Sequence, residues 1–146
     1  MKASELNSGN IFSIPMNDGR FAIAQVIWMP SGKLPTRFRN IFSFAVLSIQ
    51  NDQEIPSVND YLVFNNYRGD FKVIFTSKEN ILNGEWVLLK RDELSNIHDN
   101  LKYFNNAGDL YFLDEHVRKL AVSEYKDYNI MAVAGYELVQ QYLSQY

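Results

Sequence analysis

The sequence predicts an α+β domain. It should have a mostly antiparallel β core, either a strongly curved sheet or a small barrel, with a C-terminal α-helix packed on it. Two observations predict this class: short β-type runs bounded by Gly, Pro and Asn fill most of the chain, and a terminal segment carries apolar residues at helical spacing. The chain has 146 residues, and a domain usually has about 100–200, so we expect a single domain spanning 1–146.

The clearest predicted element is an N-terminal hairpin. Ile11–Ile14 is a short apolar run, and Pro15 ends it because proline cannot donate a hydrogen bond to a sheet ladder. Asn17-Asp18-Gly19 is typical of a hairpin turn. In the next run, Arg20–Met29, large side chains alternate with small alanines. One face therefore packs bulky groups and the other packs closely, which favours a curved sheet or a small barrel.

Further strands follow along the chain. Ile41–Ile49 is apolar on both faces, which predicts a central strand. Pro30–Asn40 is predicted to be a loop, and Ser77–Leu82 a single helical turn. Shorter strands are predicted at Tyr61–Phe64, Phe71–Phe75, Glu85–Leu89 and Leu110–Leu113.

The C-terminal part contains one open alternative and one helix. Glu115–Ala121 fits either helical spacing or the second strand of a hairpin with Leu110–Leu113. Asn129–Gln145 predicts a helix packed on the sheet, with Asn129 as its N-cap. Its apolar stripe recurs at helical intervals at Ile130, Val133, Ala134, Leu138 and Tyr142.

Composition narrows the chemistry and the compartment. The chain has no cysteine, which excludes disulfides, thiolate nucleophiles and zinc–thiolate sites. Its N-terminus lacks the apolar core of a secretory signal, and no apolar run approaches the roughly 20 residues of a membrane-spanning helix. We therefore expect a cytoplasmic protein that does not associate with a membrane.

Catalytic, metal and nucleotide motifs are missing from the sequence. Neither His98 nor His116 belongs to a metal-ligand pattern such as HxH, HxxxH or HExxH. There is no Gly-x-Ser-x-Gly elbow and no phosphate-binding glycine loop. Adjacent carboxylates on a strand, as at Asp114 and Glu115, point to opposite faces and do not form an acid–base pair. An enzyme is disfavoured, and no cofactor is expected.

The charge is uneven along the chain. The net charge is −3, with +2 over residues 1–91 (10 basic, 8 acidic) and −5 over residues 92–146 (4 basic, 9 acidic). A mildly acidic chain lacks the footprint of a general nucleic-acid binder. The acidic C-terminal part suits a basic partner, and its many tyrosines suit a binding surface. The alternative is a small β-barrel nucleic-acid module, in which cations of the Lys33–Arg39 loop contact phosphates and Phe38 stacks on a base.

The N-terminal hairpin resembles the opening of the immunity protein 26 family of bacterial polymorphic toxin systems. That opening reads Gly-(Asp)-(apolar)-Phe-x-Ile-Pro-Leu, then a turn, Gly-(Arg/Lys)-(Tyr/Phe)-Ala and Gln/Arg-Val. Here the matching residues are Gly9-Asn10-Ile11-Phe12-Ser13-Ile14-Pro15-Met16 and Gly19-Arg20-Phe21-Ala22, with Gln25-Val26 after them. Gly84-Glu85-Trp86-Val87-Leu88 and a terminal helix around Gly135–Leu143 are compatible with the family. Asn10 and Ala24 depart from its usual acidic residue and glycine.

The resemblance implies an immunity protein, which neutralises a cognate toxin by binding it without catalysis. It supplies no binding residues, so we choose candidates from charge and tyrosine content. We expect the acidic residues to steer a basic toxin surface and tyrosine to supply a contact. The candidate partner-binding residues are Asp92, Glu93, Asp99, Tyr103, Asp109, Asp114 and Glu115.

Overall fold

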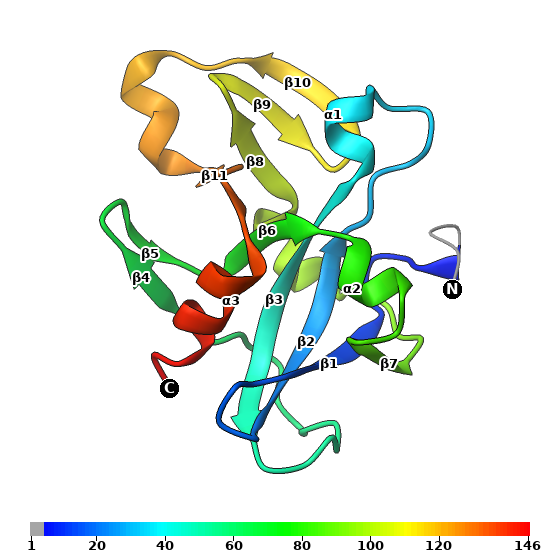
Figure 1. Cartoon of the computed structure of the whole chain (residues 1–146). Coiled ribbons are helices and arrows are strands. Elements are labelled where there is room, and N and C mark those ends of the chain that lie inside the picture. The colour runs from blue at the N-terminus through cyan, green and yellow to red at the C-terminus, as the bar shows by residue number, and fades with distance from the viewer. Residues whose placement is uncertain (1–4) are drawn as a thin grey trace.

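The structure is a computed structural model that describes residues 5–146 (Figure 1). Its main sheet has six strands in the order β12-β6-β3-β2-β1-β7. Every pair in it is antiparallel except β12 with β6. The strands are β1 (Ile11–Pro15), β2 (Phe21–Trp28), β3 (Ile41–Gln50), β6 (Val73–Ser77), β7 (Val87–Lys90) and β12 (Val133–Ala134).

Two smaller sheets and several short helices complete the fold. The second sheet has the order β10-β9-β8-β11, and β4 pairs with β5 in a separate two-stranded hairpin. These strands are β4 (Phe64–Asn66), β5 (Gly69–Phe71), β8 (Tyr103–Asn106), β9 (Asp109–Phe112), β10 (Glu115–Lys119) and β11 (Asn129–Ile130). The helices are α1 (Thr36–Arg39), α2 (Glu79–Leu82), α3 (Tyr136–Leu143) and the 3₁₀ segments η2 (Asn96–Lys102) and η3 (Val122–Asp127).

The predicted N-terminal hairpin and central strand are confirmed. β1 pairs with β2 in the register Ile11↔Gln25 to Pro15↔Phe21. Gly19 has φ +89°, a left-handed conformation that glycine adopts without steric cost. β3 lies between β2 and β6. Its side chains point alternately into two hydrophobic cores, so both apolar faces are covered, as expected for a central strand.

The main sheet separates two hydrophobic cores. The first core contains Phe12, Phe42, Phe44 and Trp86, whose contacting rings have centroids 5.6–6.3 Å apart. Helix α3 closes this core with Val139 and Leu143. In the second core, Trp28 packs on Phe104 of β8 with centroids 4.6 Å apart. The smaller β8–β11 sheet therefore covers the face opposite α3.

The barrel prediction is wrong, whereas the α+β class is confirmed. Within residues 5–146 the main sheet is open, because β12 and β7 form its two edges and do not pair with each other. Closure would need hydrogen bonds between these edges. Both edge strands are short, and β12 has only two residues.

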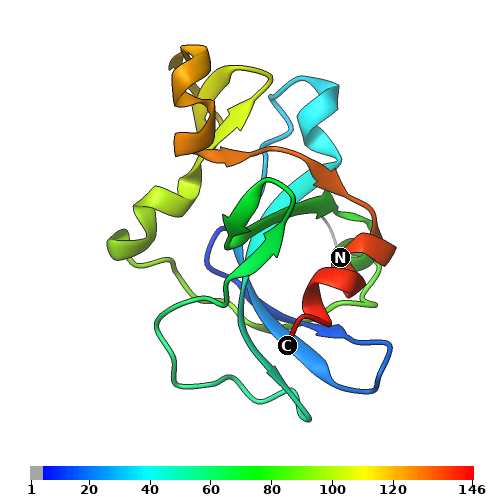
Figure 2. The ribbon, with the colours of Figure 1, turned by 90° about the vertical axis from the view of Figure 1, so that its left-hand side faces the viewer.

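The predicted helix Asn129–Gln145 is wrong in its first half. Asn129 and Ile130 pair in parallel with β8, and Val133 and Ala134 pair in parallel with β6. These sheet edges bind the backbone of the segment, so the helix begins only after Gly135. The segment thus links the two sheets, as Figure 2 shows where it crosses above the β4–β5 hairpin.

The remaining boundaries show where local patterns were ambiguous. Glu115–Lys119 is a strand paired with β9, which resolves the open alternative in favour of the hairpin. The predicted strand Phe71–Phe75 is interrupted at Lys72, between β5 and β6, and the Pro30–Asn40 loop contains α1. No helix in the described part of the chain has the length and apolar character needed to cross a membrane.

Candidate functional site

The structure distributes the predicted partner-binding residues over several places. Asp92 and Glu93 line a small pocket beside Tyr61, and Tyr103 lines a larger groove. In the β9–β10 hairpin, Asp109 and Glu115 lie at opposite ends of the ladder, because Asp109 pairs with Lys119 and Glu115 with Phe112. Asp99 lies in η2, and Asp114 lies between β9 and β10.

Three of these carboxylates pair with basic side chains of the same chain. Asp92 lies 3.5 Å from Lys90, Asp99 2.8 Å from Lys102, and Asp109 3.1 Å from the His116 ring. The backbone N–H of Glu93 and the Lys90 ammonium lower the pKa of Asp92 below its ordinary value. A paired charge contributes less to the long-range field that steers a partner, so Glu93 and Glu115, both exposed, are the stronger steering candidates.

The Asp114 carboxylate interacts with several other groups of this chain. It accepts a hydrogen bond of 2.8 Å from the Trp28 indole N–H and one of 3.4 Å from the backbone N–H of Ser31. The buried Lys78 ammonium also interacts with Asp114 electrostatically and donates to the Pro30 carbonyl at 3.3 Å. Burial lowers the pKa of Lys78. Asp114 therefore joins the β9–β10 turn to the segment after β2.

A concave surface lies between the β4–β5 hairpin and the smaller sheet. It is an open groove of about 1110 Å³. We call it the hairpin groove and define it by residues 66–75 on one wall and by Tyr103 and residues 126–130 on the other. This volume is slightly above that of a small-ligand pocket, which usually measures about 300–1,000 Å³.

The groove is lined by aromatic side chains and by nearly equal numbers of basic and acidic side chains. Four tyrosines line it, Tyr67, Tyr103, Tyr128 and Tyr142, and the Tyr103 ring lies 6.2 Å from the Tyr128 ring. The charged lining residues are three bases (Arg68, Lys72, Lys126) and two acids (Asp70, Asp127). Lys72 is already paired with Asp60 at 3.0 Å. Tyrosine and arginine are enriched where protein interfaces obtain most of their binding energy.

The tip of the β4–β5 hairpin extends from the body of the protein (Figure 1). It carries an exposed aromatic side chain. Tyr67 is 88% exposed, and the Arg68 guanidinium lies 5.1 Å from its ring centroid. Gly69 follows with φ +112°, a conformation that permits the two-residue turn. An exposed cation–π contact of this kind stabilises the arrangement of the two side chains by about 0.5–1 kcal/mol. Sequence reasoning missed this pair, which lies between the predicted strands Tyr61–Phe64 and Phe71–Phe75.

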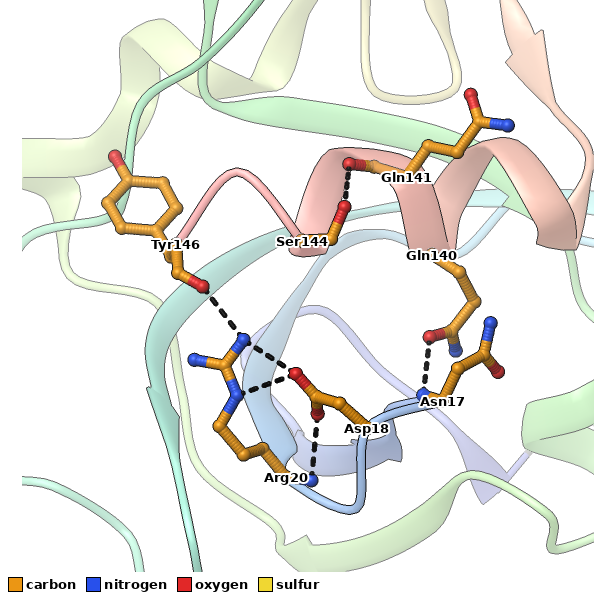
Figure 3. A network of polar contacts seen from close by, with 7 residues as sticks. All are labelled: Asn17, Asp18, Arg20, Gln140, Gln141, Ser144 and Tyr146. Atoms are coloured by element: carbon orange, nitrogen blue, oxygen red, sulfur yellow. Dashed lines mark hydrogen bonds and ion pairs between the residues drawn. The ribbon is translucent and has the colours of Figure 1, made fainter.

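The C-terminus fixes the hairpin to the body. The Tyr146 ring packs on Phe64 at 5.4 Å, and the Tyr142 ring packs on Phe71 at 5.0 Å. Figure 3 shows how the chain end is held: Arg20 donates to the backbone carbonyl of Tyr146 at 2.8 Å. Gln140 contributes as well, accepting from the backbone N–H of Asn17 at 3.1 Å. The N-terminal turn thus positions the wall of the groove through α3.

The smaller pocket, about 470 Å³, has a buried polar network at its base. The Gln25 amide donates to the Gly9 carbonyl at 2.9 Å and accepts from the Tyr61 hydroxyl at 2.6 Å. The His98 ring packs against Tyr61 at 4.8 Å. Burial, with Asp60 and Asp92 nearby, raises the pKa of Tyr61 to about 12. The hydroxyl therefore stays protonated as a donor, and the network fixes the pocket's shape.

The structure changes the interpretation of the Lys33–Arg39 loop. Phe38, proposed to stack on a base, is 1% exposed and packs between Trp28 and Tyr111 at 6.0 and 5.4 Å. Base stacking by Phe38 is therefore wrong, although Lys33 and Arg37 are exposed. Within residues 5–146, no three His, Asp or Glu side chains form a group that could hold a metal ion.

Comparison with protein-family models, with curated proteins and with solved structures finds no match to this chain. The resemblance of residues 9–26 to an immunity-protein family therefore stays a prediction.

Proposed function

We propose that this chain is an immunity protein of a bacterial polymorphic toxin system, which acts in the cytoplasm by binding a cognate toxin and blocking it without catalysis. The observation that carries this proposal is the hairpin groove with Tyr67 and Arg68 exposed at its rim. The resemblance of the Gly9–Val26 hairpin supports it independently.

The rim suits tight binding because Tyr67 and Arg68 already contact each other in the free protein. Ordering side chains on binding costs free energy, and a stacked Tyr67–Arg68 pair has already met part of that cost. Toxin–immunity pairs rank among the tightest known complexes. An interface of roughly 1,600 Å² reaches such affinity when a few well-packed anchors dominate it. We assign Tyr103, inside the groove, as a further contact and Glu93 and Glu115 as steering charges.

The main sheet is the rigid base of this site. Register shifts between β2 and β3 occur at Ile23/Ala24 and at Val26/Trp28. Such bulges bend strands and increase their twist, which supports the predicted strong curvature of the sheet. A base of this kind holds the hairpin and the smaller sheet on either side of the groove.

The proposal is tested with the toxin domain encoded by the adjacent gene. We expect co-expression of this chain to restore growth of cells that produce that domain, and the two proteins to co-purify. Tyr67→Ala and Arg68→Ala should each weaken the complex by roughly 2 kcal/mol, about thirtyfold in Kd, because they remove the rim anchors. Titration calorimetry measures this change.

Arg37→Ala is the matched control. Arg37 is also exposed, and its guanidinium lies 4.8 Å from the Phe38 ring, but it lies outside the groove. The control should bind like the wild type. Equal losses for Arg37→Ala and Arg68→Ala would contradict the assignment of the rim, and the absence of both rescue and binding would end the proposal.

A further inference from the structure

The backbone of the β4–β5 hairpin has two different edges. The strands pair through Phe64↔Phe71, Asn65↔Asp70 and Asn66↔Gly69. In an antiparallel ladder, alternate residue pairs exchange both hydrogen bonds, and the pairs between them direct N–H and C=O groups outward. Each outward-facing residue of β4 therefore has a counterpart on β5 that faces the opposite edge.

The outer edge of β4 is occupied by side chains from the C-terminus. The Asn65 N–H donates to the Gln145 amide oxygen at 3.0 Å, and the Gln145 amide nitrogen donates to the Asn65 carbonyl at 2.9 Å. Two residues earlier, the Tyr146 hydroxyl accepts from the Val63 N–H at 3.1 Å and donates to its carbonyl. These contacts identify Asn65↔Asp70 as a pair whose backbone groups point outward.

The outer edge of β5 lies in the hairpin groove. By the same alternation, the N–H and C=O of Asp70 point away from β4, and Gly69, Asp70 and Phe71 all line the groove. Within residues 5–146, β4 is the only strand paired with β5, and no hydrogen bond from another segment reaches the Asp70 backbone. Figure 1 shows this edge facing β11 and η3, on the side opposite the C-terminus. An open strand edge of this kind is a template for another strand.

The surroundings of the edge fit a protein segment. The groove includes the buried apolar residues Val73, Phe75, Leu101 and Ala134. Each wall carries both signs of charge, Arg68 and Asp70 on the hairpin and Lys126 and Asp127 opposite. Nucleic acid needs a strongly basic surface, which this balance does not provide. An extended chain with alternating apolar and polar side chains matches both the apolar residues and the mixed charges.

We infer that an extended segment of the cognate toxin adds to the free edge of β5 as a third strand of the hairpin, inside the hairpin groove. The inference rests on the proposed function and specifies how that surface binds. Main-chain hydrogen bonds from Asp70 provide affinity, and the groove walls select the side chains of the segment.

The test compares two substitutions at one position, using the toxin domain encoded by the adjacent gene. Asp70→Pro removes the outward N–H and places a ring at the edge, whereas the hydrogen-bonded pairs with β4 remain. Asp70→Ala is the matched control, because it removes the carboxylate and keeps the N–H. We expect Asp70→Pro to bind the toxin domain at least about thirtyfold more weakly than Asp70→Ala does, because both variants lack the carboxylate and only Asp70→Pro also lacks the N–H.

Amide hydrogen exchange on the wild-type complex provides a second measurement that needs no substitution. The Asp70 amide should exchange at least about tenfold more slowly in the complex than in the free protein. The Asn65 amide, already bonded to Gln145, is the internal reference. If Asp70→Pro fails to fold, as judged by circular dichroism, the exchange result alone decides.

The outcomes separate this inference from the proposed function. Unchanged exchange at Asp70 in the complex, or full affinity of a folded Asp70→Pro variant, overturns strand addition and leaves toxin binding in place. A wild-type chain that neither binds nor neutralises the toxin domain overturns the proposed function, and strand addition falls with it.

Discussion

Trp28 joins the two layers of the molecule through both its ring and its indole N–H. The ring packs on Phe104 at 4.6 Å and on Phe75 at 6.4 Å, and the N–H donates to Asp114 at 2.8 Å. Asp114 was selected from the sequence as a partner contact, yet its two carboxylate oxygens already bind groups of this chain. A carboxylate used in this way has a role in stability whether or not it contacts a partner.

We predict that Trp28→Phe destabilises the protein more than Trp86→Phe does. Both tryptophans are buried, 2% and 3% exposed, but within residues 5–146 no hydrogen bond involves the Trp86 indole nitrogen. The difference in the free energy of unfolding should be about 1.5–3 kcal/mol, the usual value of a hydrogen bond to a charged group. Urea denaturation measures it. Equal losses would show that the Asp114 bond contributes nothing to stability.

At the scale of elements, an ion pair joins η3 to the smaller sheet. The Arg118 guanidinium of β10 donates two hydrogen bonds to Glu124, at 3.0 and 2.6 Å. Glu124 also accepts from the backbone N–H of Ala121 at 3.0 Å. The Arg118 hydrogen bond, followed by that of Ala121, lowers the pKa of Glu124 from 4.5 to about 2.

This lowered pKa predicts how stability depends on pH. A carboxyl group with a lower pKa in the folded state stabilises the protein above its unfolded pKa and loses that contribution as pH falls through the folded value. Wild-type protein should therefore be more stable than Glu124→Gln above pH 4.5, and the difference should vanish near pH 2. Thermal unfolding across this range measures it. A difference independent of pH would contradict the assignment to the ion pair.

At the scale of the whole molecule, the acidic and basic groups are interleaved. The sequence places a net charge of −5 in residues 92–146, but folding sets Asp92, Asp99 and Asp109 beside Lys90, Lys102 and His116. Lys102 is already counted in this value, so among these partners only Lys90, from the first part of the chain, offsets the excess. The exposed Glu93 and Glu115 remain the better candidates for attraction of a basic partner over a distance.

Reversing these two charges tests the steering hypothesis. We predict that Glu93→Lys with Glu115→Lys slows association with the toxin domain several-fold at low salt, and that the effect shrinks as salt rises. The control is Glu54→Lys with Glu79→Lys, two exposed acids from the first part of the chain with the same change in net charge. Stopped-flow mixing measures the rates. Equal slowing by both pairs would assign the effect to net charge alone.

Local patterns predicted some elements well and others poorly. The β1–β2 hairpin and the central strand β3 are confirmed, because turn residues and apolar alternation act over a few neighbours. β11 and β12 have two residues each, which is too short for any apolar alternation to show in the sequence. The apolar spacing predicted a helix over Asn129–Gln145, but the helix begins only at Tyr136. Of the residues that line the hairpin groove, the sequence analysis proposed Tyr103 as a partner contact. It did not propose Tyr67 or Arg68, because exposure at a hairpin tip leaves no local pattern in the sequence.

The sequence by itself determined the α+β class, the N-terminal hairpin and the apolar strand at the centre, since these depend on side-chain order along the chain. Tertiary structure alone decided that the main sheet stays open, that residues 129–134 bridge two sheets, and that the edge of β5 faces a groove. The reason is physical: a two-residue strand or a free edge is defined by which distant backbone groups reach it, and those distances are set only when the cores have packed.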